Sequence, residues 1–211
     1  VNMAKLKDIR GTGIQFLDED PTPGIAGWAS GGSMNTARYT LAGVGTQTQA
    51  LGFGGRTPSY VGNTEQYNGS SWTETSDLNT GRGYLGAAGT YTAALAFGGV
   101  TPPSSALTES WNGSSWTEVN DLNTARNEHA GFGTQTAAIA ATGYAGGMVA
   151  VVEQWNGSSW TETGDVNTAR GDSGGVGTTT NGVIFGGYTP TITGATEVWN
   201  GSAWTETTDL N

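Results

Sequence analysis

The residues that could do chemistry are few, and they do not form a catalytic constellation. The sequence holds one histidine, His129, and no cysteine. A general base or a nucleophile needs partners of matched protonation within reach. A lone histidine is more often a packed or surface residue than a base or a ligand. We therefore expect a protein that is not an enzyme and that holds no metal and no cofactor.

The carboxylates that recur along the chain favour a structural role. They lie 44 residues apart at Glu65, Glu109, Glu153 and Glu197, and again at Asp77, Asp121, Asp165 and Asp209. A catalytic site would break this symmetry, because only one copy would carry it. Asp77 and Arg82 flank one turn, as do Asp121 and Arg126, then Asp165 and Arg170. This spacing predicts an ion-pair clasp between repeats, worth about 0–1 kcal/mol if exposed.

The whole chain is organised by the same period. The tetrapeptide Asn-Thr-Ala/Gly-Arg begins at Asn35, Asn79, Asn123 and Asn167, always 44 residues apart, without insertion or deletion. A fixed period of this length is typical of repeat architectures. The repeats are 35–78, 79–122, 123–166 and 167–210.

Each repeat contains four short stretches of strand character. In the first repeat these are Ala42 to Val44, Ala50 to Gly55, the Glu-x-aromatic segment from Glu65 to Tyr67, and the segment that begins at Trp72. An Asn-Gly dipeptide, such as Asn68-Gly69, separates the last two stretches. Asn-Gly is the strongest short hairpin signal, because both residues tolerate the positive φ of a type I′ turn. The Gly content, 36 of 211, suits such turns.

The repeated arginine and aromatic residues are assigned to the scaffold. Large aromatics in stacked sheets pack between neighbouring sheets more often than they bind sugars. The assigned residues are Arg38, Arg82, Arg126 and Arg170, with Trp72, Trp116, Trp160 and Trp204.

This order of features resembles the kelch motif over residues 35–210. The shared elements are an arginine, an apolar strand, a second apolar strand that ends in Gly-Gly, an aromatic residue, and then a tryptophan. The resemblance implies an all-β propeller of four full blades, each a four-stranded antiparallel sheet, plus an N-terminal partial blade. The third repeat has Thr142-Gly143 in place of Gly-Gly, so a different connection is expected there. The copper oxidase chemistry of some kelch proteins needs a cysteine ligand, which this chain lacks.

A second resemblance concerns the N-terminal region. The phrases LKDIRGTGIQFLDEDP and GWASGGSMNTAR, followed by YNGSSWTE repeats, are similar to kelch-type repeat proteins of marine bacteriophages, commonly virion or tail-associated proteins. The resemblance implies a virion or extracellular location. Residues 1–24 would then dock to other virion proteins, and residues 25–211 would form the propeller.

The charge balance argues against two classes of partner. Eight Lys and Arg against 18 Asp and Glu give a net charge of −10. Such a surface repels phosphate backbones and anionic lipid headgroups. No apolar run reaches the roughly 18 residues of a membrane-spanning helix. We expect neither nucleic-acid binding nor membrane insertion.

The chain also begins with part of a further repeat. Trp28 lies 44 residues before Trp72, and Ile14 to Leu17 with Ile25 to Trp28 can form half of another blade. Propellers commonly close by pairing strands from both chain ends in one blade, which removes exposed sheet edges. Two alternatives stay open: four blades close alone beside an accessory N-terminal strand, or a neighbouring subunit or further repeats supply the missing half. A homo-oligomer is one form of the second alternative.

The repeats agree in some loops and differ in others. The turns between the first two strands (GTQT, GTYT, GTQT, GTTT) and between the last two (NGSS, NGSS, NGSS, NGSA) barely vary. The loops after the second strand differ, as do the residues after the repeated arginine. With strands alternating in direction, both variable sets must emerge on one face. The candidate ligand-binding residues there are Arg56, Tyr60, Tyr84, His129, Tyr144, Asp172 and Tyr188.

Variable loops on a rigid scaffold usually carry recognition. The expected function is binding to a host surface glycan or receptor, or to another virion protein. The alternatives are a structural decoration protein without a host ligand and, least favoured, a carbohydrate-active enzyme such as a kelch-type sugar epimerase. Unconstrained loop drift would also produce such variation.

Overall fold

The computed structural model describes residues 30–211, and this part of the chain is all-β. Residues 32–211 form one compact unit, the second of two in the chain. The expected docking segment, residues 1–24, and the partial blade through Trp28 lie outside the described residues. The second unit contains four antiparallel sheets of four strands each, which we call blades 1 to 4.

The strands follow the repeats closely. Blade 1 contains β1 (Ala42–Gly45), β2 (Ala50–Phe53), β3 (Thr64–Tyr67) and β4 (Trp72–Glu74). Blade 2 contains β5 (Gly86–Thr90), β6 (Ala93–Phe97), β7 (Thr108–Trp111) and β8 (Trp116–Val119). Blade 3 contains β9 (Ala130–Thr134), β10 (Ala137–Ala141), β11 (Val152–Trp155) and β12 (Trp160–Glu162). Blade 4 contains β13 (Gly174–Gly177), β14 (Gly182–Phe185), β15 (Thr196–Trp199) and β16 (Trp204–Thr207). The expected division of each repeat into four strands is confirmed.

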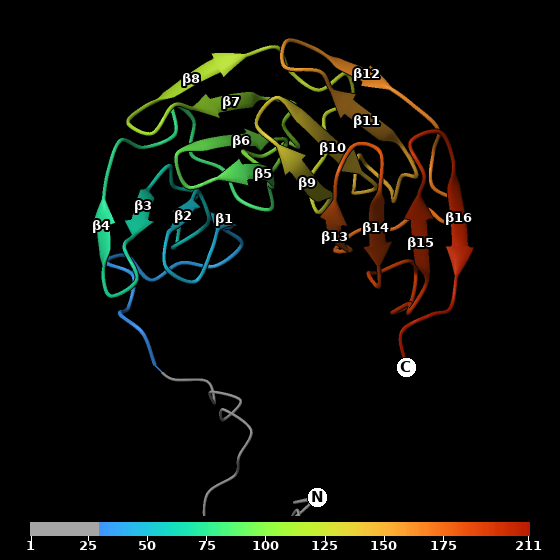
Figure 1. Ribbon diagram of the computed structural model, residues 1–211, viewed down its shortest axis with the longest axis horizontal. Coiled ribbons are helices and arrows are strands. Elements are labelled where there is room, and N and C mark those ends of the chain that lie inside the picture. Colours follow the sequence, from blue (N-terminus) through green and yellow to red (C-terminus); the bar gives the residue numbers. More distant parts are fainter. Residues whose placement is uncertain (1–29) are drawn as a thin grey trace, which may run out of the picture. The chain divides into compact units, whose positions relative to one another are not determined.

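Within residues 32–211 the blades follow one another around an open arc (Figure 1). The first strand of each blade lies on the inside, and β1 packs beside β5, β5 beside β9, and β9 beside β13. No comparable packing joins β13 back to β1 in this part of the chain. The expected all-β class with propeller-like blades is confirmed, and the four blades do not close a ring.

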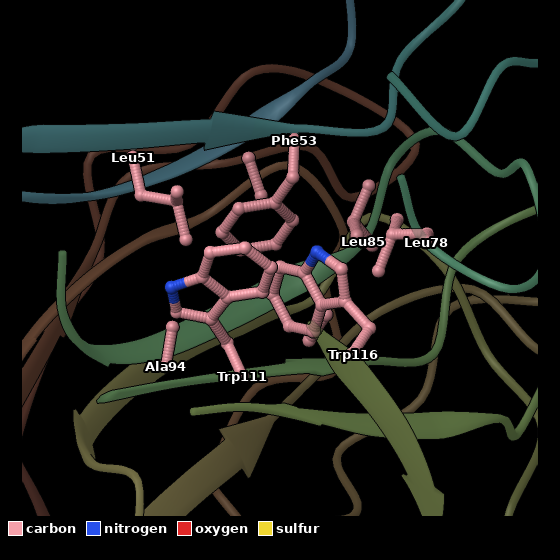
Figure 2. Close-up of a cluster of buried hydrophobic side chains, with 9 residues drawn as sticks. Leu51, Phe53, Leu78, Leu85, Ala94, Trp111 and Trp116 are labelled. Atoms are coloured by element: carbon pink, nitrogen blue, oxygen red, sulfur yellow. The ribbon is translucent and has the colours of Figure 1, made fainter. Parts of the chain in front are cut away.

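Successive side chains of a strand point to opposite faces of its sheet. We call the face of a blade toward the next blade its leading face, and the opposite face its trailing face. At the first junction Leu51 and Phe53, on the leading face of blade 1, pack against Ala94, Trp111 and Trp116 on the trailing face of blade 2 (Figure 2). The rings of Phe53 and Trp116 meet edge to face with centroids 4.8 Å apart.

The expectation that the repeated tryptophans pack between sheets is confirmed at all three junctions, where six of them are buried. The Trp116 indole Nε1 donates to Thr64 Oγ1 of the preceding blade (3.0 Å), and Trp160 Nε1 donates to Thr108 Oγ1 (3.1 Å). A buried indole N–H needs such a partner. Trp116 and Trp160 therefore hold blades 2 and 3 in register with the blade before each.

The repeated arginines pair with the repeated glutamates of their own blade, so the expected Asp–Arg clasp is wrong. Arg126 lies 2.6 Å from Glu153 and Arg82 lies 3.1 Å from Glu109, with every side chain in these pairs buried. The same pair recurs as Arg38 with Glu65 and Arg170 with Glu197. Asp77 instead accepts a hydrogen bond from the backbone N–H of Thr64 (3.1 Å).

The Asn-Thr-Ala/Gly-Arg motif wraps around each buried glutamate. Asn35 donates to Glu65 Oε2 through both its backbone N–H (2.7 Å) and its side-chain Nδ2 (2.8 Å). Burial opposes ionisation of Glu65, but the hydrogen bonds from Asn35, Arg38 and Thr36 outweigh it and lower the pKa of that carboxyl. The motif thus recurs because it satisfies a buried charge in every blade.

The turn between the last two strands is not the predicted type I′ turn. Tyr67 pairs with Trp72, which leaves a four-residue loop, Asn68 to Ser71. Only Gly69 has a positive φ, +95°. The Asn68 Oδ1 accepts hydrogen bonds from the backbone N–H groups of Ser70 and Ser71, both at 3.0 Å. The asparagine side chain and the single positive φ of Gly69 together turn the chain.

The expectation that the third repeat has a different connection after its second strand is also wrong. Thr142 and Gly143 have φ values of 67° and 113°, close to the 66° and 108° of Gly54 and Gly55. The chain takes the same path, and Thr142 accepts a backbone conformation that favours glycine.

Candidate binding face

The two variable sets of residues do lie on one face, as the alternating strand directions predicted. Tyr39, one residue after Arg38, forms an antiparallel bridge with Arg56 at the start of the loop between β2 and β3. The backbone N–H of each donates to the carbonyl of the other, at 3.1 and 2.8 Å. The same bridge joins Gly83 to Val100, Asn127 to Tyr144 and Gly171 to Tyr188. We call this surface the variable face: 39–40 and 56–61, 83–84 and 100–105, 127–128 and 144–149, 171–172 and 188–193.

Several large side chains of the variable face are exposed. Tyr39 is 52% exposed, Tyr144 39% and Tyr188 44%, while Ile192 is 90% exposed. Exposed aromatic rings on a rigid scaffold are common contact residues in binding sites. Arg56 lies over the ring of Tyr60, with its guanidinium carbon 5.2 Å from the ring centroid, within cation–π range.

A ladder of hydrogen bonds between blades runs through this face. The backbone N–H of Tyr84 donates to the Thr40 carbonyl (2.9 Å), that of Glu128 to Tyr84 (3.1 Å), and that of Asp172 to Glu128 (2.8 Å). Thr40, Tyr84, Glu128 and Asp172 all have φ between 52° and 57°. Such strain outside glycine is found where the surrounding structure fixes the backbone, often at functional sites.

The ladder brings acidic and phenolic groups together. Burial raises the pKa of Tyr84, and the neighbouring Tyr60, Glu128, Tyr39 and Asp172 raise it further. Burial also raises the pKa of Glu128, with a contribution from Asp172. The carboxylates can accept hydrogen bonds from hydroxyl-rich ligands, and the tyrosine hydroxyls can both donate and accept them. Sequence reasoning missed Tyr39 and Glu128, although Glu128 occupies the same repeat position as Tyr84 and Asp172.

Of the seven candidate residues, His129 lies apart from the rest. It is 7% exposed, and its ring packs against Phe97 with centroids 5.5 Å apart. Burial, with help from the nearby Arg126, lowers the pKa of His129 to about 3. Its imidazole is thus neutral and beneath the face. Arg56, Tyr60 and Tyr84 are half-buried on the face, and Tyr144, Asp172 and Tyr188 are exposed there.

The described residues contain neither a cluster of metal ligands nor a membrane-spanning helix. Between residues 30 and 211 no group of three or more His, Cys, Asp or Glu could hold a metal ion. In the same region no helix is long and apolar enough to cross a membrane. Residues 30–211 are all-β, and their four blades form a propeller-like arc. No family model matches it, and no curated protein matches it.

Proposed function

We propose that this chain is a non-enzymatic, kelch-like propeller of a phage virion or tail that binds a host surface glycan or receptor, or another virion protein, through the variable face. The kelch and phage assignments rest on the sequence resemblances described above. The observation that supports binding is the contrast between the two ends of the blades. The turns at one end are nearly identical, and the other end carries different loops with exposed tyrosines.

Glycan binding fits the groups on this face. Tyrosine rings stack on the apolar faces of sugar rings while their hydroxyls reach polar neighbours. Tyr144 and Tyr188 begin the corresponding loops of neighbouring blades, and carboxylates of the ladder supply acceptors for sugar hydroxyls. The net charge of −10 favours neutral or cationic ligands over polyanionic ones.

An exchange of loops within the chain tests the proposal. In the variant, residues 188–195 (YTPTITGA) and 144–151 (YAGGMVAV) are each replaced by residues 100–107 (VTPPSSAL), a loop that blade 2 already folds. The matched control is Ala203→Ser, which makes the turn of blade 4 identical to the other three. Binding is measured on an array of bacterial surface polysaccharides.

We expect the loop variant to lose at least about tenfold in affinity, since exposed aromatic anchors dominate such sites. The control should bind like the wild type. Equal binding by the loop variant refutes a role for this face. A wild type that binds no polysaccharide and whose deletion leaves adsorption intact but weakens the particle would favour the decoration alternative.

A further inference from the structure

The four turns between the last two strands of each blade lie at the surface, and the proposed binding function does not use them. They span residues 68–71, 112–115, 156–159 and 200–203, and each begins with an Asn-Gly dipeptide whose asparagine is exposed. The side-chain amide of an asparagine before glycine is open to attack by the glycine nitrogen, because glycine has no side chain that blocks the approach. The chain therefore holds a reactive pair of groups in each of these turns.

In every turn three donors reach the asparagine side-chain oxygen. In blade 1 Asn68 Oδ1 accepts hydrogen bonds from the backbone N–H of Ser70 (3.0 Å), from the Ser70 hydroxyl (2.9 Å) and from the backbone N–H of Ser71 (3.0 Å). The same three positions donate at 2.9–3.0 Å to the side-chain oxygens of Asn112, Asn156 and Asn200. Donors at this spacing stabilise the negative charge that a carbonyl oxygen gains when its carbon is attacked, as in an oxyanion hole.

The attacking nitrogen is free in the same turns. Among residues 30–211 the backbone N–H of Gly69 donates no hydrogen bond, and neither do those of Gly113, Gly157 and Gly201. A peptide N–H that is not held by an acceptor is available to a base from solvent. The nitrogen and the amide carbon belong to neighbouring residues, so the reaction between them is intramolecular and needs no encounter.

A fifth Asn-Gly dipeptide lacks this arrangement. Asn181 ends the turn between β13 and β14 and is exposed like the other four asparagines. No residue between 30 and 211 donates to its side-chain oxygen, and its Nδ2 donates to Thr180 Oγ1 at 3.5 Å. Gly182 begins β14, pairs with Gly177 and is buried. The chain thus contains the same dipeptide with and without the three donors.

We propose that the four turns deamidate themselves, converting their asparagine to aspartate or isoaspartate with release of ammonia. The glycine nitrogen loses its proton to a solvent base and forms a bond to the asparagine Cγ. The Cγ–Nδ2 bond then breaks, Nδ2 takes a proton from water, and ammonia leaves behind a cyclic imide. Water opens this imide. Breaking the bond from the glycine nitrogen to Cγ gives aspartate, and breaking its bond to the main-chain carbonyl carbon gives isoaspartate. Each event adds one negative charge to this end of the blade.

The two products differ in their effect on the blade. An aspartate carboxylate still offers acceptors to the three donors, so the turn persists. In isoaspartate the main chain passes through the former side chain and is longer by one carbon. Tyr67 pairs with Trp72 across the four-residue loop, so the longer chain should disturb the pairing of β3 with β4. At the junctions the corresponding Trp116 and Trp160 pack between blades, so isoaspartate should weaken the contact with the preceding blade.

Peptide mapping by mass spectrometry tests the proposal on the folded full chain. After incubation in alkaline buffer made with heavy-oxygen water, the four turns should contain aspartate and isoaspartate that carry the heavy oxygen. Asn181 should react at least about fivefold more slowly, because it lacks the three donors and a free glycine nitrogen. The rates in the turns should rise with pH, since a base removes the glycine proton. Unmodified turns, or a reaction at Asn181 that is as fast as in the turns, overturn the proposal.

A single substitution isolates the role of the donors. Ser114→Ala removes the hydroxyl that donates to Asn112 Oδ1 (2.9 Å) from an exposed position, so folding is preserved. The reaction at Asn112 should slow about fivefold, while the other three turns of the same molecule keep their rates. The matched control is Thr117→Ala, which removes an exposed hydroxyl from β8 that does not donate to this oxygen. An unchanged or faster reaction at Asn112 in Ser114→Ala, or equal slowing in Thr117→Ala, overturns the proposal.

Discussion

Replacing Val152 with threonine should stabilise the protein, although it places a hydroxyl in the core. At two junctions a threonine accepts the indole N–H of the next blade: Thr64 from Trp116 and Thr108 from Trp160. At the third junction the corresponding residue is Val152, which is fully buried. Within the described residues the buried Nε1 of Trp204 has no hydrogen-bond partner. Val152→Thr supplies the missing acceptor in a geometry that the chain uses twice.

The expected gain can be estimated from opposing effects. Relieving a buried donor without a partner returns about 1–3 kcal/mol. Exchanging a buried methyl group for a hydroxyl costs about 1–2 kcal/mol. The net stabilisation should be about 1 kcal/mol, or a rise in melting temperature of about 2–4 °C for a unit of this size. The reverse change, Thr108→Val, should destabilise blades 2 and 3 by a similar amount.

Urea unfolding followed by circular dichroism measures both variants, and a second background isolates the cause. In Trp204→Phe the indole N–H is absent, so Val152→Thr should there lower the free energy of unfolding, because the buried hydroxyl gains no donor. The sign of the effect thus depends on residue 204. Destabilisation by Val152→Thr in the wild-type background, or the same change in both backgrounds, would refute this account of the junctions.

Two further predictions concern buried ionisable groups. Glu109→Gln leaves Arg82 as a buried, unpaired cation and should lower the free energy of unfolding by about 3 kcal/mol, while the control Glu118→Gln, on the same rung of the sheet but exposed, should change little in the same urea titration. His129 has its folded pKa lowered to about 3, so below its unfolded pKa of 6.5 the unfolded state binds the additional proton and stability falls. His129→Leu, which copies Leu41 and Leu85, removes this loss. The variant should gain about 2 kcal/mol over the wild type between pH 8 and pH 5, and parallel pH profiles would contradict it.

Much of the fold could be predicted because the sequence contains four copies of the blade pattern, and features shared by all four copies mark its strands and turns. The Gly-Thr and Asn-Gly turns mark strand ends in every copy, and the alternating strand directions place the variable loops on one face. The exposure of Tyr144 and Tyr188 could be anticipated in this way, because turns at the ends of strands lie at the surface.

The partners of charged groups could not be predicted. Arg82 has two candidate carboxylates, Asp77 nearby in sequence and Glu109 further along. Sequence separation favours Asp77. However, the Asp77 carboxylate accepts a hydrogen bond from the backbone N–H of Thr64, and Glu109 forms the ion pair with Arg82. The burial of His129 was equally hidden, because a shift of one residue at a strand end exchanges the core side for the solvent side.

The blades share one repeat pattern, yet the sequence differences between them fix their order. Phe132 on the leading face of blade 3 replaces the smaller Val44 and Ala88 of blades 1 and 2. Its ring lies where an added Cβ at Gly182 would approach it to 2.7 Å, and the other blades carry alanine at that position. Because cores are packed to high density, a large residue on one blade requires a small one on the next. Each of these junctions is therefore matched to its own neighbouring blade.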